Sequence, residues 1–383
     1  MSAPLTVLDP ADQEWRDRAR TFAEKRIAPL SATMDKSATL DPAVRTALFE
    51  EGFMGVEIPR RYGGAGGGLF QMMIVIEEIA RVDPGVAVGV DVHNALVAAT
   101  LLRQAGGDQR RQFLPRLAAG AVGAFALSEE QAGSDAFALS TTATPDGDTY
   151  VLSGRKRWTS NARNADLFLL FATVPGKGPT AFLVDRDTAG ITLDHRVEQL
   201  GVRAAATSDL VLDGAVVRKD RCVNGVGNGQ AVAVAALDVG RVGIAAQLVG
   251  LAQGALDLAV DYARGREQFG SRVGDYQGVR FPLAQAATEV AAARTLTYEV
   301  VRQIEHGADP VERLRAAAMA KLFASQVADR TAALAVEVLG GNGYTDAYPA
   351  ERLYRDAKAG RIYEGTDNIL LRGIGAILLG ERR

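Results

Sequence analysis

The sequence is poor in the residues that form disulfides and bind metals. Cys222 is the only cysteine among the 383 residues, which excludes an intramolecular disulfide and a cysteine-cluster metal site. The three histidines, His93, His195 and His306, lie far apart and lack the short spacing of metal ligands. The sequence therefore predicts no metal site.

An excess of basic residues and a targeting segment are also missing. The net charge is -3 and the pI is about 5.8, and no basic run is interleaved with aromatic residues, which argues against nucleic acid as a partner. Charged residues recur through positions 9–20, where a secretory signal would need an apolar core. The uncharged stretch at residues 242–256 contains Gln247 and Gln253 and is shorter than a membrane span. We therefore expect a cytoplasmic protein with no membrane partner.

Length and pattern indicate a multidomain α+β protein. A chain of 383 residues is too long for one small core, and 48% hydrophobic with 23% charged residues describes an ordinary globular protein. The hydrophobic period is helical, then typical of strands, then helical again. We predict an N-terminal all-α domain at residues 1–121, a middle β-barrel or β-sandwich domain at 122–225, and a C-terminal four-helix bundle at 226–383.

The expected elements can be placed within these domains. Turn signals separate short β-rich runs, and alanine-rich segments carry the helical period of the bundle. Two glycine clusters, at residues 63–68 and 225–229, fit neither a Walker motif nor a dinucleotide fingerprint, so we read them as an interhelix turn and a domain-joining loop. The expected strands include residues 150–152, 167–174, 180–184 and 210–212, and the expected bundle helices span 231–265, 276–306, 310–339 and 366–380.

One carboxylate near the C-terminus has the surroundings of a catalytic base. Glu364 lies between Tyr363 and Gly365 in an otherwise apolar stretch. An apolar pocket raises the proton affinity of a carboxylate, and the glycine lets the backbone approach a ligand closely. These features suit the removal of a proton from carbon. The alternative, a loop glutamate that faces solvent, also fits this hexapeptide.

Other segments contain glycines, hydroxyls and arginines suited to a large anionic ligand. Each segment alone also fits an ordinary turn, core strand, helix surface, helix cap or helix-face ion pair. The segments are residues 128–135 (SEEQAGSD), 155–162 (RKRWTSNA), 262–270 (YARGREQFG) with Tyr276 and Gln277, 337–343 (EVLGGNG), and the pair Asp238 and Arg241.

Taken together, these segments and residues 363–366 (YEGT) resemble the acyl-CoA dehydrogenase family, and the resemblance runs from the first helix to the last residues. They are similar to the family's Thr-Glu-Pro-x-Ala-Gly-Ser-Asp, Lys-x-Trp-Ile-Thr-Asn-Gly, Arg-x-x-Phe-Gly, Gln-x-Leu-Gly-Gly-x-Gly and Tyr-Glu-Gly-Thr elements. One family branch carries its base at the position of Gly240, which leaves Glu364 as the base here. The chain departs from the family at Ser128, Glu130, Glu337, Asp367 and Asn368.

The resemblance implies FAD as the cofactor, with Trp158 flanking the flavin and Ser160 beside flavin N5. A hydroxyl can donate a hydrogen bond to a ring nitrogen that gains charge on reduction. Arg266 corresponds to an arginine that serves the FAD of a neighbouring subunit, so the resemblance also implies a dimer-based homo-oligomer, a tetramer built as a dimer of dimers. The implied FAD-binding residues are Phe125, Leu127, Ser128, Gly133, Ser134, Trp158, Thr159, Ser160, Arg266, Gln268, Phe269, Tyr276, Gln277, Glu337, Gly340, Gly341, Thr366 and Asn368.

The implied reaction is the α,β-dehydrogenation of an acyl-CoA thioester in fatty acid or amino acid catabolism. Glu364 would take the α-proton while the β-hydrogen leaves as hydride to flavin N5, which gives a trans-2-enoyl-CoA. An electron-transfer flavoprotein would then reoxidise the flavin. The implied substrate-binding residues are Ser134, Asp238, Arg241, Tyr363 and Gly365.

Several alternatives remain open at this point. An oxidase that uses O2 would share the scaffold, and a carrier protein instead of coenzyme A could bear the acyl group. A glutaryl-type enzyme is disfavoured because its arginine aligns with Ala87, and a nitroalkane oxidase because its base is an aspartate. A non-catalytic helical oligomer would have lost these residues. The floor of the acyl pocket is expected in residues 86–96, where Asp91 and His93 either add polarity or, as we slightly prefer, face solvent.

Overall fold

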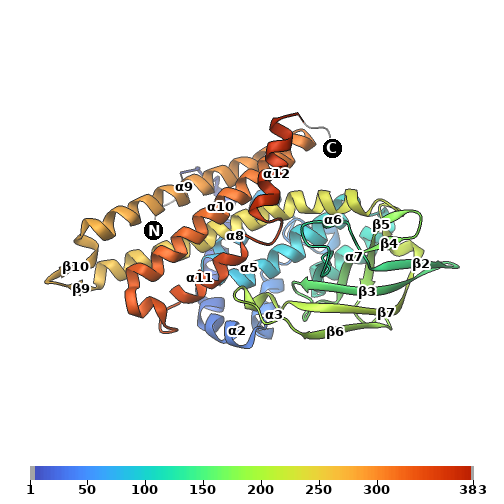
Figure 1. Ribbon diagram of the computed structural model, residues 1–383, viewed down its shortest axis with the longest axis horizontal. Helices are drawn as coiled ribbons and strands as arrows, with labels where there is room; N and C mark the ends of the chain where they lie inside the picture. Colours follow the sequence, from blue (N-terminus) through green and yellow to red (C-terminus); the bar gives the residue numbers. More distant parts are fainter. Residues whose placement is uncertain (1–4, 381–383) are drawn as a thin grey trace.

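The computed structural model describes residues 5–380, apart from the side chains of residues 195 and 196. Helices form both ends of the chain and a sheet forms the middle, so that the protein is 58% helical and 15% strand. Figure 1 shows the sheet at one end of an elongated molecule and the long C-terminal helices extending away from it. The expected order of helical, β and helical parts is therefore present.

The N-terminal part is all-helical. Aspartates begin three of its helices, because the side chains of Asp9, Asp41 and Asp83 accept hydrogen bonds from backbone N–H groups of the first turn, and a proline follows each. The helical segments are α1 (Pro10–Phe22), η1 (Ala23–Ile27), η2 (Ala28–Leu30), α2 (Ser31–Ser37), α3 (Pro42–Glu50), η3 (Arg60–Tyr62), α4 (Leu69–Ala80), α5 (Pro84–Asp91), η4 (Val92–Ala98), α6 (Ala99–Gln104) and α7 (Gly107–Ala119).

The middle part is one twisted sheet with the order β6-β7-β3-β2-β4-β5-β8, and β1 pairs parallel to β4. Strand β4 is apolar on both faces, since Phe171 packs with Phe113 of α7 and Phe168 packs in the opposite core. The four predicted β runs lie in β3, β4, β5 and β7. The strands are β1 (Gly123–Ala126), β2 (Thr142–Asp146), β3 (Thr149–Thr159), β4 (Leu167–Val174), β5 (Gly178–Asp185), β6 (Ile191–Arg196), β7 (Ser208–Arg218) and β8 (Cys222–Val223), with η5 (Arg203–Ala205) and η6 (Lys219–Arg221) between them.

The C-terminal part contains the predicted bundle and one helix that the sequence pattern did not predict. Helix α8 packs along α10 and α9, and buried alanines such as Ala252 and Ala328 let the helices approach closely. The short helix α11 was missed because its sequence, AERLYRDAKA, is mostly polar. The elements are α8 (Gly229–Gly265), β9 (Glu267–Gln268), β10 (Ser271–Arg272), η7 (Val273–Asp275), α9 (Gln277–Glu305), α10 (Pro310–Leu339), η8 (Gly340–Tyr344), α11 (Ala350–Ala359) and α12 (Asp367–Leu378).

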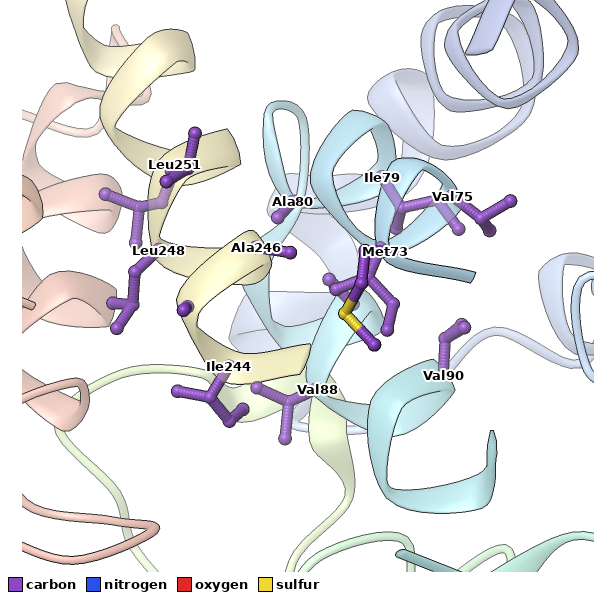
Figure 2. Packing of buried hydrophobic residues seen from close by; sticks show 14 of the residues in the cluster. Met73, Val75, Ile79, Ala80, Val88, Val90, Ile244, Ala246, Leu248 and Leu251 are labelled. Carbon is purple, nitrogen blue, oxygen red and sulfur yellow. The ribbon is translucent and has the colours of Figure 1, made fainter. Parts of the chain in front are cut away.

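Helix α8 joins the N-terminal and C-terminal parts through one core. Figure 2 shows Ile244, Ala246, Leu248 and Leu251 of α8 in the same packed cluster as side chains of α4 and α5. The backbones approach closely at Gly250, where an added Cβ would stand 2.1 Å from the carbonyl oxygen of Glu77. This contact fixes α4 against α8.

Two helical stretches, Pro84–Gln104 and Gly229–Gly265, are long and apolar enough to cross a membrane by length and composition. Of their most apolar windows, 94% and 72% are buried inside the protein. The uncharged run at residues 242–256 is itself shorter than a membrane span, but it lies within the second stretch, which has 37 residues. Core helices of soluble proteins pass the same test, so this finding alone is weak evidence for a membrane.

Candidate active site

Glu364 lies in the short loop between α11 and α12, and three contacts hold this loop against the bundle. The Tyr363 hydroxyl donates to the Gln247 side-chain oxygen at 2.8 Å, Lys321 Nζ donates to the Gly365 carbonyl at 2.7 Å, and Arg241 Nε donates to the Glu364 carbonyl at 3.3 Å. Glu364 has a φ of +54°, a conformation that side chains other than glycine rarely adopt. The loop thus keeps an unfavourable backbone conformation through contacts to α8 and α10.

The carboxylate of Glu364 points inward. The residue as a whole is partly exposed, but its Oε2 atom is buried and has no hydrogen-bond partner among the described residues. An added Cβ at Gly240 of α8 would stand 3.2 Å from this oxygen, so the glycine makes room for the carboxylate. Burial raises the pKa of Glu364 to about 7, although the charges of Arg241 and Lys321 act to lower it. A carboxylate with this pKa can take a proton at neutral pH.

Asp91 and His93 are both fully buried, so our preference for solvent-facing residues was wrong. The packing of the segment 84–98 between α8 and β1 causes this, because neither face of that segment reaches solvent. His93 Nδ1 accepts a hydrogen bond from the Gly123 backbone N–H at 3.0 Å, and burial lowers the pKa of His93 to about 4. For Asp91, burial and then the charge of Glu364 raise the carboxyl pKa well above its usual range.

A buried ion pair fixes the segment that follows β1. Lys156 Nζ donates to Glu129 Oε1 at 2.6 Å and to the Leu127 carbonyl at 3.0 Å, and the Arg157 backbone N–H donates to the Ser128 carbonyl at 2.9 Å. Burial lowers the pKa of Lys156 to about 8. Burial alone would raise the pKa of Glu129, but the Lys156 charge and hydrogen bonds, including one from Ser140, lower it to about 2. Sequence reasoning did not single out Lys156 or Glu129 as a pair.

This ion pair joins the first two predicted motifs. Leu127 and Ser128 are held beside the end of β3, and the segment then continues as a loop in which Glu129 and Ala132 are buried while Gly133 and Ser134 are exposed. Phe125 packs on Phe171 with 5.0 Å between ring centroids. The residues expected along the flavin from these two motifs therefore lie together in one region.

Trp158 and its neighbours fit a flavin. The indole is 47% exposed, and the backbone has a φ of +54° while its N–H donates to Asp209 Oδ1 at 3.1 Å. The buried Thr159 Oγ1 has no hydrogen-bond partner within the described chain, and Ser160 is half-buried at the end of β3. An accessible aromatic face beside hydroxyls suits a polar ring system such as isoalloxazine.

Asp238 and Arg241 do not form the helix-face ion pair that was the ordinary alternative, at least among the described contacts within 4 Å. Instead Asp238 lines a groove of about 560 Å³ at the start of α8, together with Asn228, Gln230 and Arg313. Burial raises the pKa of Asp238 to about 6, although the charges of Arg241 and Arg313 act to lower it. The groove is roomy and polar enough to hold part of a large ligand.

A second group of predicted residues lies at the opposite end of the bundle. Helix α8 has 37 residues, so it spans about 55 Å, and Arg266 lies about 37 Å along the axis from Arg241. The β9–β10 hairpin projects from this far end (Figure 1), and Phe269 at its turn is 97% exposed. The residues of this distal cluster, all outside the buried core, are Arg266, Gln268, Phe269, Tyr276, Gln277, Glu337, Gly340 and Gly341.

The distal cluster is held together locally. Tyr276 Oη donates to the Gln268 carbonyl at 2.9 Å, and Asn342 Nδ2 donates to Tyr262 Oη at 2.8 Å, which ties η8 to the end of α8. Glu337 is exposed, so a carboxylate at this position carries little desolvation cost. Within one chain, the distal cluster therefore lies far from Glu364.

Thr366 and Asn368 follow Glu364 in the sequence. Thr366 Oγ1 accepts from the Ile369 backbone N–H at 3.4 Å and begins α12 as its N-cap, while Asn368 is exposed. Lys321 and Gln247 are buried contacts of the loop that sequence reasoning missed. Within residues 5–380, no three His, Cys, Asp or Glu side chains gather to hold a metal ion, and the His195 side chain is not described.

Known proteins provide an independent comparison. Models of the acyl-CoA dehydrogenase N-terminal, middle and C-terminal domains match residues 9–121, 124–215 and 227–379. The short/branched chain specific acyl-CoA dehydrogenase of Rattus norvegicus is 41% identical over 97% of this chain and 86% of its own. Among solved structures, butyryl-CoA dehydrogenase from Megasphaera elsdenii has a TM-score of 0.94 at 34% identity and covers 98% of this chain and 99% of its own.

A chain from a structure described as the electron transferring flavoprotein of Acidaminococcus fermentans is also similar, with a TM-score of 0.94, 36% identity and coverage of 97% of this chain and 99% of that one. The matches to all three domain models and to these relatives extend over nearly the whole chain. The protein is an oxidoreductase that belongs to the FAD-dependent acyl-CoA dehydrogenase family.

Proposed function

We propose that Glu364 is the base that removes the α-proton of an acyl-CoA thioester. The observation that carries this proposal is the buried Oε2 atom of Glu364, which has no hydrogen-bond partner in the described structure. Burial keeps the pKa of this carboxyl near neutral, where the ionised form is both present and basic. FAD, when bound, supplies the acceptor for the β-hydrogen as a hydride.

The loop geometry supports this role. The backbone of Glu364 is fixed by Arg241, and that of Gly365 by Lys321, so the carboxylate can be presented without ordering a mobile segment during the reaction. Phe125, Leu127, Ser128, Trp158, Thr159 and Ser160 would hold the flavin. The groove beside Asp238 would hold part of the coenzyme A moiety, with Arg241 and the exposed Ser134 as further contacts.

The acyl group is proposed to be short or branched. The sequence similarity to the short/branched chain specific enzyme of Rattus norvegicus supports this choice. Leu96 also packs beside the base, since an added Cβ at Gly240 would stand 2.5 Å from Leu96 Cδ2 and 3.2 Å from Glu364 Oε2, and a side chain there would limit the length of the acyl group. Such a reaction belongs to the catabolism of fatty acids or amino acids, and we propose a cytoplasmic location for it.

The complete enzyme is proposed to be a homotetramer built as a dimer of dimers, without nucleic acid or membrane partners. The distance of the distal cluster from Glu364 supports this assembly, because Arg266 could serve only the FAD of another subunit. An electron-transfer flavoprotein is proposed as the acceptor, and the similarity to the Acidaminococcus chain supports it.

The test is anaerobic bleaching of the bound flavin by butyryl-CoA and 2-methylbutyryl-CoA. The variant Glu364→Gln keeps the size of the side chain but removes the base, so FAD should stay bound while the rate of bleaching falls by about 10⁴-fold. Glu299→Gln, at an exposed position of α9, is the matched control and should bleach normally. Near-normal bleaching in the Glu364→Gln variant would show that Glu364 is not the base.

A further inference from the structure

One face of α8 carries three successive positions that meet buried polar groups. Gly240, Gly243 and Gln247 are spaced i, i+3 and i+7, so they lie on the same side of the helix. Gly240 faces the carboxylate of Glu364, and Gly243 faces the carboxylate of Asp91. Gln247 meets the hydroxyl of Tyr363. The three positions therefore form a polar stripe inside an apolar core.

The carboxyl group of Asp91 occupies the space that a side chain at position 243 would need. An added Cβ at Gly243 would stand only 1.7 Å from Asp91 Oδ1. Asp91 ends α5, and Figure 2 shows Val88 and Val90 of α5 in the same cluster as Ile244 of α8. The packing of α5 on α8 thus holds this carboxyl group in place.

Most polar atoms of the stripe are buried and unpaired, and the exception is the side-chain oxygen of Gln247, which accepts from the Tyr363 hydroxyl. Asp91 and Gln247 have no exposed surface. Both carboxyl oxygens of Asp91, the side-chain nitrogen of Gln247 and Oε2 of Glu364 have no hydrogen-bond partner anywhere in residues 5–380 that the structure describes. Buried polar groups in proteins are almost always hydrogen-bonded, so a set of unpaired ones beside a catalytic base indicates groups that a ligand satisfies.

The base and the unpaired groups follow one another along one face of α8. Gly240 with the base comes first, and Gly243 and Gln247 follow, whereas the groove lined by Asp238 lies on the other side of the helix. Gly243 lies about 4.5 Å further along the helix axis than Gly240. If the α-carbon lies at the base, an acyl chain that runs along this face of α8 extends toward Asp91 and Gln247.

The charges around the stripe select the chemistry of the group that would bind there. Asp91 and Glu364 are both acidic, and the two cations that act on Glu364 are engaged with the backbone, since Lys321 and Arg241 donate to carbonyls of the 363–366 loop. His93 is neutral and accepts from Gly123. A terminal carboxylate on the acyl chain would be repelled. A neutral group that both donates and accepts hydrogen bonds would pair with a protonated Asp91 and with the amide of Gln247.

We propose that Asp91 and Gln247 are specificity-determining residues that bind a hydroxyl group on the acyl chain, about three C–C bonds beyond the α-carbon. This inference rests on the proposed function, because it places the α-carbon at Glu364. The preferred substrate would then carry a short hydroxyacyl chain, and a plain hydrocarbon chain would be used less well. A hydroxyl there would accept from Gln247 Nε2 and donate to Asp91.

The experiment compares two acyl-CoAs of nearly equal size, 5-hydroxypentanoyl-CoA and hexanoyl-CoA, in which a hydroxyl replaces a methyl group. The anaerobic rate of flavin bleaching divided by the dissociation constant is measured for each. The wild-type protein should favour the hydroxylated substrate by at least about tenfold. Asp91→Leu should reverse this preference, whereas Asp91→Asn, which keeps hydrogen-bonding capacity, should retain it.

Gln247→Met provides a second route if Asp91→Leu does not fold, and it should also lower the preference for the hydroxylated substrate. Equal or better use of hexanoyl-CoA by the wild type, with an unchanged ratio in the folded variants, would overturn the inference and assign the unpaired atoms to bound water. In that outcome the proposed function stands, because both substrates still bleach the flavin. If neither they nor butyryl-CoA bleach it, the proposed function fails and this inference fails with it.

Discussion

The two ends of the C-terminal bundle differ in what one chain can build alone. At the base end, side chains from α5, α8, α10 and the 363–366 loop meet in a buried region, and the contacts of Glu364 come from a single chain. At the distal end, the β9–β10 hairpin exposes Phe269 and Arg266 to solvent. The base end therefore has buried, unpaired polar atoms, whereas the distal end has an exposed arginine and an exposed aromatic side chain, which our proposal assigns to a contact with another subunit.

The sharpest test of this comparison mixes two variants, one that lacks the base and one that binds FAD weakly. Subunits with Glu364→Gln lack the base but keep Arg266, and subunits with Arg266→Ala keep the base. In a mixed dimer, one site would combine the intact base of one subunit with the intact arginine of the other. We expect mixed oligomers to bleach flavin at about half the wild-type rate at limiting FAD, about 10³-fold or more above the Glu364→Gln protein.

The mixed oligomers would be purified with two different tags and compared with each parent variant and with the untreated mixture. If Glu364 and Arg266 of the same chain served the same site, the bleaching rate of the mixed oligomers would equal the average of the rates of the two parent variants. Such a result would mean that the distal cluster does not serve a neighbouring subunit.

The next test concerns the base end alone. Burial raises the pKa of Glu364 to about 7 from its ordinary value of 4.5. The reaction needs the ionised form, so bleaching should rise with pH through about 7 and change by about 100-fold between pH 5 and pH 8. The stability of the folded state should change with pH in the opposite direction. A raised carboxyl pKa stabilises the folded state at low pH, and this contribution is lost as the pH rises through 7. Single-turnover bleaching across this pH range measures the first effect, and a flat profile would contradict it.

The sequence predicted the fold and the buried surroundings of the Glu364 carboxylate better than it predicted the polar contacts between parts. The YEGT segment is local, and the periods of α8, α9 and α10 are long, so Glu364 and the main helices could be recognised from neighbouring residues. Asp91 could not be placed, because its burial depends on how α5 packs against α8 over 150 residues away. The Lys156–Glu129 pair and the contact of Lys321 with Gly365 likewise join segments whose spacing in the sequence carries no signal.

A third test addresses the distal end by itself. Arg266→Gln removes a charge suited to a pyrophosphate while keeping polarity, so the dissociation constant for FAD should rise by about 10- to 100-fold. Fluorescence titration of the apoprotein with FAD measures it. Arg264→Gln is the matched control, because Arg264 is also exposed at the end of α8 but pairs with Asp261. An equal loss of affinity in both variants would mean that general charge at this end matters and the position of Arg266 does not.

The smallest expected effect concerns Lys321, which supports the 363–366 loop and also changes the proton affinity of Glu364. Lys321 is fully buried, donates to the Gly365 carbonyl at 2.7 Å, and lowers the pKa of Glu364 through its charge. Lys321→Met should therefore move the pH profile of bleaching to higher pH and reduce the rate at pH 7 by about threefold to tenfold.

The control for that variant is Lys358→Met, at a half-exposed lysine that pairs with Asp329. A loss of stability alone would lower the amount of folded protein but would leave the midpoint of the pH profile in place. A shifted midpoint in Lys321→Met, absent from Lys358→Met, would therefore separate the charge of Lys321 from its packing. An unshifted midpoint would mean that Lys321 only supports the loop, and that burial and the charge of Arg241 set the proton affinity of Glu364.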